Sequence, residues 1–384
     1  MGSGSSKSGD QQSPEDEREP RLATAAKAPG SGRIGQVRPL NVAIVALPES
    51  TAYVLFGLKE VMEAAGPLWG MVTGNPPAEA RFAVTVIAAG TEPFACAGGA
   101  WVKADTTFSG NGRFDIVLVT DLTIDPDADP RGSWPEVTGW LAARHAEGAV
   151  VASICSGSVL LADAGLLDGK EATTHWAFAE TYARCYPAVA WRPERILAMA
   201  DAEERVVTAG GAASWEDLTL WLVARFVGPA EAIRLAKIYI FGDRSEGQLL
   251  YAARRRPRRH DDRVIADCQE WLAEHYATPD ILARLIGRSG LSEKSFTRRF
   301  KAATGHAPLD YVQRLRIEEA KELLETTSEP VEAIGRSVGY EDTSFFRRLF
   351  KRQSGVTPTR YRQRFAGIGK QPASLPEPAP RDCR

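Results

Sequence analysis

Residues 331–355 read VEAIGRSVGYEDTSFFRRLFKRQSG, and residues 281–305 read ILARLIGRSGLSEKSFTRRFKAATG. Each stretch has a helical pattern, a turn at Gly290 or Gly339, and a second helical pattern rich in Phe, Arg and Lys. An offset of 50 positions brings nine identical residues into register: Phe296/Phe346, Arg298/Arg348, Phe300/Phe350, Lys301/Lys351, Gly305/Gly355, Pro308/Pro358, Tyr311/Tyr361, Gln313/Gln363 and Arg314/Arg364. The rear of the chain therefore contains an internal duplication.

Each copy has the pattern of a helix-turn-helix, in which two helices are joined by a short turn that often contains Gly. The second helices are predicted over 292–303 and 342–353. Each carries two Phe four residues apart, which share one helix face and are expected to pack inward. The Arg and Lys between them then face solvent. One amphipathic helix over 309–325 separates the copies, and the duplication makes the prediction far more specific than a single motif.

The charge is unevenly spread along the 384 residues, whose formal net charge is −2. Residues 1–253 hold 21 Lys and Arg against 31 Asp and Glu, a net of −10. Residues 254–366 hold 23 against 16, a net of +7, and residues 367–384 add +1. Such asymmetry suggests a nucleic-acid partner for the basic part, and a chance excess of surface Arg is the alternative.

Composition excludes several other classes. The chain has 5 Cys and 5 His. Because the Cys form no cluster and show no metal-ligand spacing, neither a disulfide scaffold nor a metal site is expected. No apolar run approaches the ~20 residues of a membrane helix, and the first residues lack the apolar segment of a signal peptide. A cytoplasmic protein without a cofactor, and without a membrane partner, is expected.

Residues of about 260–366 resemble the AraC-type DNA-binding domain, which carries two helix-turn-helix units. The ending GYEDTSFFRRLFKRQSGVTPTRYRQRF (339–365) fits that family closely. One departure is Ile286, where the family usually has a small Ala at the helix crossing, and Gly335 holds the matching place in the second copy. The resemblance implies an all-α module whose two second helices enter successive major-groove segments of DNA, where base edges are distinguishable.

Matching positions to that family predicts which side chains contact DNA. The expected base contacts are Lys294, Thr297, Arg298, Thr343, Ser344, Arg347 and Arg348. The expected phosphate contacts, which position rather than specify, are Arg299, Lys301, Lys351 and Arg352. For any single Arg the alternative is a solvated surface residue. The run RRRPRR (254–259) is expected only to add nonspecific phosphate attraction.

The front of the chain alternates β-rich runs with helical patterns. The β-rich runs are NVAIVAL (41–47), RFAVTVIAAG (81–90), FDIVLVT (114–120), AVVASIC (149–155) and RVVTAGG (205–211). Helices are expected at about 52–65, 135–147, 156–165, 175–185, 214–227 and 229–241. Nearly continuous apolar strands that alternate with helices predict a doubly wound, flavodoxin-like α/β domain with a parallel sheet. The predicted division is a disordered tail at 1–38, the α/β domain at 39–242, a basic linker at 243–260, the helix-turn-helix domain at 261–366 and a disordered tail at 367–384.

Cys155 ends one β-rich run and is followed by Ser156, Gly157 and an apolar helical pattern. A nucleophile at a sharp strand-to-helix turn is the elbow arrangement. A helix N-terminus lowers a thiol pKa, so a thiolate is expected there.

Residues 40–242 resemble the ThiJ/PfpI branch of the class I glutamine amidotransferase-like superfamily. The resemblance is carried by the stretch from Cys155 through AGLLDGKEATTHW (164–176). Together with the rear domain, this order of domains is similar to that of the GlxA-type AraC regulators. Catalytic relatives place His directly after the Cys, where this chain has Ser156, and others place an acid at the position of Val54. Glu49 lies nearby in sequence and is a candidate substitute.

The candidate ligand pocket comprises Glu49, Cys155, Ser156, His175 and Trp176, with Thr173 and Thr174 from the same TTHW phrase. The alternative for His175 is a hydrogen-bonded structural residue. For Cys155 the alternatives are retained catalysis, ligand or redox sensing, and a purely structural turn.

These features predict a sequence-specific transcription regulator whose front domain senses a small-molecule effector or dimerises. The expected partners are double-stranded promoter DNA, the effector, a second copy of the chain and RNA polymerase. The first alternative is a Cys-dependent hydratase or amidohydrolase fused to a DNA-binding domain, without the expected His and acid. The second is a constitutive architectural DNA binder with a dimerising front domain.

Overall fold

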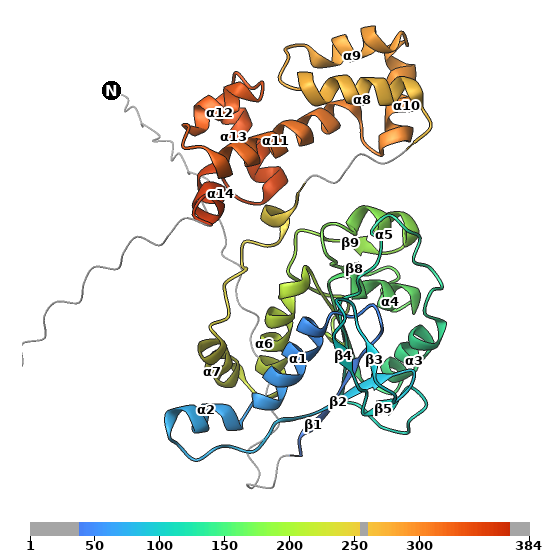
Figure 1. Ribbon diagram of the computed structural model, residues 1–384, viewed down its shortest axis with the longest axis vertical. Helices are drawn as coiled ribbons and strands as arrows, with labels where there is room; N and C mark the ends of the chain where they lie inside the picture. Colours follow the sequence, from blue (N-terminus) through green and yellow to red (C-terminus); the bar gives the residue numbers. More distant parts are fainter. Residues whose placement is uncertain (1–37, 254–259, 369–384) are drawn as a thin grey trace, which may run out of the picture. The chain divides into compact units, whose positions relative to one another are not determined.

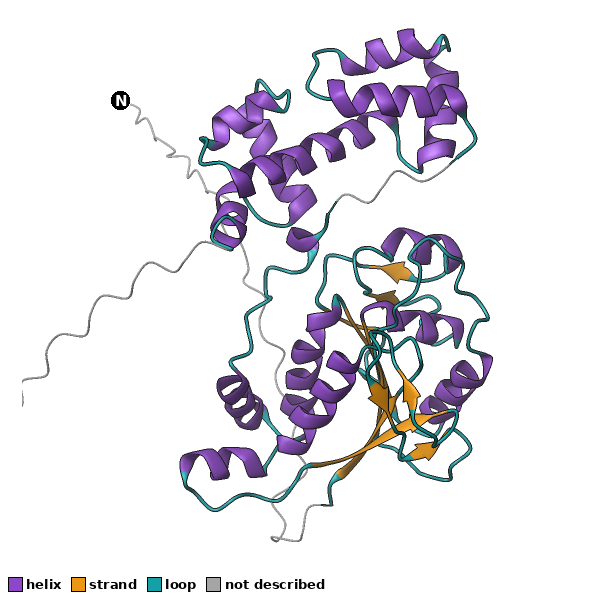
Figure 2. Cartoon of the chain, viewed as in Figure 1, coloured by secondary structure: helices purple, strands orange, loops and turns teal. Residues whose placement is uncertain are grey.

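The computed structural model describes residues 38–253 and 260–368 (Figure 1). Most of the predicted tails and the run RRRPRR lie outside the described residues. Within them the chain forms a sheet domain, residues 40–239, and a helical module, residues 263–365. Figure 2 shows that all the described strands belong to the first and that the second is helical throughout.

A seven-stranded sheet in the order β10-β11-β7-β6-β1-β2-β5 is the centre of the sheet domain. Its strands are β1 (Leu40–Val45), β2 (Phe82–Ala88), β5 (Thr106–Thr107), β6 (Ile116–Val119), β7 (Val150–Ile154), β10 (Leu197–Met199) and β11 (Val206–Ala209). Only β10 is antiparallel to its neighbour. The five predicted strands appear as β2-β1-β6-β7-β11, the flavodoxin-like order 2-1-3-4-5. The doubly wound fold is therefore confirmed.

Helices cover both faces of this sheet, and alternate strand residues face each layer. Val42 and Ile44 pack on one side, whereas Ala43 and Val45 pack on the other. The first layer contains α1 (Ala52–Ala64), α6 (Trp215–Phe226) and α7 (Pro229–Tyr239). The second contains α3 (Pro135–Ala146), α4 (Ser158–Asp163) and α5 (Ala179–Cys185). Because the strands are buried on both faces, their sequence is almost continuously apolar.

The sequence analysis missed the shorter elements of this domain. These are α2 (Pro67–Thr73), β5, β10, the pair β3 (Phe94–Ala95) and β4 (Trp101–Val102), and the pair β8 (Glu171–Ala172) and β9 (Ala190–Trp191). Most are strands of two or three residues, too short to show any alternation of apolar side chains.

The helical module consists of two half-modules that share one long helix, α11 (Pro308–Thr326). The first contains α8 (Arg263–His275), α9 (Ile281–Ser289) and α10 (Glu293–Thr304), and the second contains α12 (Val331–Ser337), α13 (Thr343–Ser354) and α14 (Pro358–Phe365). Val312 and Leu315 of α11 join the first core, whereas Ile317, Ala320 and Leu324 join the second. In Figure 1, α11 runs from one group of helices to the other.

The predicted inward packing of the repeated Phe pairs is confirmed. Phe296, Phe300, Phe346 and Phe350 are each fully buried. The predicted second helices match α10 and α13 with a shift of one residue at each end. No helix among residues 38–253 and 260–368 has the length and apolarity to cross a membrane.

Candidate DNA interface and the Cys155 site

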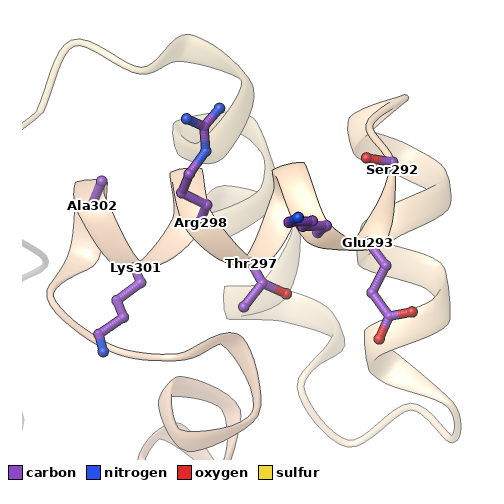
Figure 3. A pocket seen from close by; sticks show the side chains of 7 residues that line it. Ser292, Glu293, Thr297, Arg298, Lys301 and Ala302 are labelled. Carbon is purple, nitrogen blue, oxygen red and sulfur yellow. The ribbon is translucent and has the colours of Figure 1, made fainter.

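The solvent face of α10 carries most of the predicted contacts of the first half-module. Lys294, Thr297, Arg298 and Lys301 are all exposed, because the buried Phe pair turns the opposite face of the helix to the core. They border a shallow hollow of about 910 Å³, shown in Figure 3. Its full lining is Ser292, Glu293, Lys294, Thr297, Arg298, Lys301 and Ala302. Long cationic side chains beside a Thr methyl can contact both phosphates and base edges.

The matching face of α13 presents Ser344, Arg347 and Arg348 to solvent, with Thr343 half-buried at the start of the helix. Lys351 and Arg352 lie exposed in its last turn. Arg347 forms an ion pair with Glu332 of α12. A base contact by Arg347 would therefore require it to leave Glu332.

Side-chain caps define where α10 and α13 begin. Asp342 accepts hydrogen bonds from the backbone N–H groups of Ser344 (2.8 Å) and Phe345 (3.1 Å). Ser292 accepts one from the N–H of Ser295 at 3.4 Å. Such caps satisfy amide groups that the first helical turn leaves without a partner. The cap of α13 is the tighter of the two.

Arg299, a predicted phosphate contact, is half-buried and bound to a carboxylate. Its Nε and Nη2 donate to the two carboxylate oxygens of Asp262 at 2.9 and 2.8 Å. Asp262 also caps α8 by accepting from the N–H of Ile265. The Arg299 hydrogen bonds lower the pKa of the Asp262 carboxyl. In this structure Arg299 ties α10 to α8.

Cys155 lies at the predicted elbow, between β7 and a short 3-10 turn (Cys155–Gly157) that leads into α4. Its φ of 56° is in the left-handed region, as a sharp nucleophile turn requires. The side chain is nevertheless buried. Burial, and next the negative charge of Asp121, raise the pKa of the thiol to about 12. The expectation of a thiolate was wrong, because loss of solvation outweighs the helix N-terminus here.

Hydrogen bonds hold the elbow from both sides. The Ser156 hydroxyl accepts from Leu122 N–H at 2.7 Å and donates to Leu122 O at 2.6 Å. The Tyr182 hydroxyl donates to Ser156 O at 2.9 Å, and the Thr174 hydroxyl donates to Cys155 O at 3.0 Å. Ser156 therefore anchors the turn.

Glu49 and His175, predicted to line the same pocket as Cys155, form no hydrogen bond with its thiol among the described residues. One carboxylate oxygen of Glu49 is buried without a hydrogen-bond partner. His175 accepts from Ala177 N–H at 3.1 Å, its ring contacts Trp176 at 4.9 Å between centroids, and burial lowers its pKa.

Asp121 is the acid that sequence reasoning missed. It follows β6, and its carboxylate accepts from the Thr51 hydroxyl at 2.8 and 3.0 Å. Burial raises its pKa. Because carboxyl ends of parallel strands share one sheet edge, the polar residue directly after FDIVLVT was the signal that could have located it.

Comparison with known proteins finds similarity to both parts of the chain. The DJ-1/PfpI family profile matches residues 53–225, and a helix-turn-helix domain profile matches residues 285–364. The HTH-type transcriptional regulator CdhR of Pseudomonas aeruginosa is 28% identical over 298 residues, which cover 77% of this chain and 85% of that protein. The HTH-type transcriptional regulator GlxA of Rhizobium meliloti is 27% identical over 218 residues, or 56% and 65% of the two chains. A solved structure of an AraC family transcriptional regulator from Pseudomonas putida aligns with a TM-score of 0.43 and 17% identity over 52% of this chain and all of that one.

Proposed function

Because the chain is an AraC-family regulator of the GlxA type, with a DJ-1/PfpI domain before its helix-turn-helix module, we propose that α10 and α13 read promoter DNA. The observation that carries this proposal is the pair of exposed basic faces, each opposite a fully buried Phe pair. The shared helix α11 connects the two cores, so the two reading helices belong to one unit. Arg298 and Arg348 are the proposed guanine readers, because Arg can bind O6 and N7 of guanine together.

The test uses the full chain and a promoter fragment selected from its bound genomic sites. Arg298→Ala and Arg348→Ala should each weaken specific binding by about 1–3 kcal/mol and relax base preference at one position of the site. Arg184→Ala, on the exposed surface of α5 in the sheet domain, is the matched control and should bind like the wild type. If both reading-helix variants also bind like the wild type, the assignment of α10 and α13 fails.

We further propose that the sheet domain regulates rather than catalyses. The support is the buried Cys155 thiol, whose pKa burial raises and which forms no hydrogen bond with His175 or Glu49 among the described residues. A protonated thiol is a poor nucleophile. Iodoacetamide at pH 8 should therefore label Cys155 in the native chain far more slowly than in the urea-unfolded chain, as measured by mass spectrometry. Any hydratase or amidase turnover that disappears in Cys155→Ser would instead support the enzyme hypothesis.

We also propose that two copies associate through the sheet domain and that the bound regulator contacts RNA polymerase. The support for association is Tyr53 and Phe56 of α1, large apolar side chains that are 59% and 45% exposed. Phe56→Glu should shift the sedimentation coefficient of the full chain toward that of a single copy. An unchanged coefficient would exclude this face as the contact.

A further inference from the structure

Residues 246–252, here called the strap, follow the sheet domain. They have no part in the proposed contacts with DNA. Gln248, at the centre of the strap, is only 2% exposed. Its side chain enters the sheet domain beside the TTHW phrase. The amide Nε2 lies 2.8 Å from Thr174 O, 3.2 Å from Thr173 Oγ1 and 3.2 Å from Arg195 O.

These partners are all hydrogen-bond acceptors toward Gln248. The two carbonyl oxygens can only accept, and the Thr173 hydroxyl already donates to Arg195 O at 2.8 Å. The carboxamide oxygen Oε1 is buried without a hydrogen-bond partner. The site therefore recognises an N–H donor group and leaves the carbonyl half of the amide unsatisfied, which costs free energy.

Two glycines shape the space that the carboxamide fills. A Cβ on Gly210 would lie 2.6 Å from Gln248 Nε2, so with any other residue at 210 the carboxamide would have to shift. Gly247 has a φ of +79°, and a Cβ there would lie 2.4 Å from the carbonyl oxygen of Glu194. The strap can approach the sheet domain this closely because its residue 247 has no side chain.

The same strap is fixed to the second half-module on the other side of Gln248. Leu250 is 2% exposed and belongs to the core of α12, α13 and α14. The buried Lys321 donates to Ala252 O at 2.8 Å, and Tyr251 packs edge-on against Phe365. Gln248 and Leu250 are two residues apart, so the amide site and the second core are joined by one short peptide.

A chain of contacts also leads from this site to the elbow. Thr174 accepts from Gln248 through its carbonyl and donates to Cys155 O through its hydroxyl. His175, the next residue, lies beside Gly211, which also borders the Gln248 amide oxygen. The amide site is thus part of the region around Cys155.

We propose that Gln248 is a tethered occupant of an effector site for primary amides, and that an effector carrying such a group displaces Gln248 and detaches the strap from the sheet domain. This inference rests on the proposed function of the sheet domain as a small-molecule sensor. The class of ligand follows from the acceptors. A carboxylate offers no N–H. It would face two carbonyl oxygens and the Thr173 hydroxyl, which already donates its hydrogen to Arg195 O. None of the Gln248 contacts in the described structure is a carboxylate, so a buried ammonium would be unpaired and costly.

The test is competition by a free amide in the full chain. Gln248→Ala removes the carboxamide, and acetamide has the atoms of the missing group. The variant should show faster hydrogen exchange than wild type at 249–252, by about tenfold, the factor for one lost net hydrogen-bond contribution. Acetamide should displace the Gln248 side chain in the wild type and speed exchange at 249–252 toward the rate of the variant, and it should leave the variant unchanged, because no carboxamide remains to be displaced. Acetate, of the same shape but without N–H, should change neither.

Gln248→Glu is the second variant, because it keeps the volume of the side chain and removes its N–H donors. It should also speed exchange at 249–252, whereas Gln363→Ala, at an exposed position of α14, should leave it unchanged. Equal exchange in wild type, Gln248→Ala and Gln248→Glu, or a wild-type response to acetate as well as acetamide, would overturn the inference. Promoter binding by the wild type is measured in parallel. Absence of the acetamide response with normal promoter binding overturns the amide site alone, and absence of promoter binding overturns the proposed function.

Discussion

The two half-modules have equivalent cores and different surroundings. In both, a Phe pair on the reading helix packs against α11 and its neighbouring helices. Around the first, α10 borders an open hollow, and in the described residues Arg298 and Lys301 form no ion pair. Around the second, Arg347 is bound to Glu332 and the strap inserts Leu250 into the core. The comparison teaches that both copies keep the same core, whereas among the described residues the strap enters the core of the second copy, and the first copy contacts the sheet domain through His306 and Glu180, at 3.1 Å.

The copies also differ where their helices cross. Gly335 of α12 lies against Phe346, and a Cβ there would come within 3.0 Å of the Phe346 ring. The first copy has Ile286 at the matching place, half-buried in its core. At the offset of 50, Arg299 of the first copy corresponds to Leu349 of the second, which is 2% exposed. An ion pair in one copy thus replaces a buried apolar side chain in the other.

The largest effect is expected from breaking either core. Phe300→Ala and Phe350→Ala should each lower the free energy of unfolding by about 3–5 kcal/mol, because a fully buried ring is lost and a cavity remains. Urea unfolding followed by hydrogen exchange should show that each variant opens its own half-module first. Simultaneous opening of both halves in either variant would contradict the division into two cores.

A smaller loss of stability is expected from a substitution where α12 crosses α13. Gly335→Val should destabilise the second half-module by about 1–3 kcal/mol, because Phe346 must move to accept the new side chain. Gly287→Val is the matched control on α9, where an added Cβ has open space around it. Thermal unfolding should separate the two variants. If they are equally stable, the close contact between Gly335 and Phe346 does not constrain the fold.

DNA binding can be used to compare the two reading helices directly. Lys301→Ala and Lys351→Ala, at equivalent exposed positions, should each weaken binding to all sequences alike and lower the slope of log K against log salt by about 1. Binding titrations at several salt concentrations measure that slope. A change in base preference would mean that the Lys reads sequence rather than phosphate.

The smallest change in stability is expected when the pH is lowered. The Arg299 partner lowers the Asp262 pKa in the folded state, so the pair contributes stability above the ordinary Asp pKa of about 3.9 and loses it as pH falls through the lower, folded value. The second copy has Leu349 instead and lacks this dependence. Hydrogen exchange below pH 4 should show α8 and α10 loosening before α13, and Asp262→Asn should remove the difference between pH 3 and pH 6.

The helix-turn-helix duplication and the five main strands were predictable because both rest on local periodicity. A Phe pair four residues apart marks one helix face wherever the helix packs. Runs such as FDIVLVT are apolar because both faces of their sheet are covered. The positions of Lys294, Thr297 and Arg298 on the exposed face of α10 follow from the same spacing. Their contacts with DNA remain a prediction.

The sites around Cys155 were less predictable, because they depend on residues far apart in sequence. Asp121, rather than Glu49, supplies the charge that acts on the thiol, since β6 and β7 are neighbours in the sheet. Burial rather than the helix N-terminus controls the state of Cys155. The role of Gln248 has no signal in the strap sequence itself, because its partners at 173, 174 and 195 lie more than fifty residues away.

The sequence by itself determined the order of the domains, the two repeated helices α10 and α13 and the alternation of strands and helices, since each depends on spacings of a few residues. Only the tertiary structure decided that Cys155 is a buried thiol, that Arg299 binds Asp262 and that the strap joins an amide site to the second core. Solvation and hydrogen bonding depend on which distant groups share a small volume, and that is set when the chain packs.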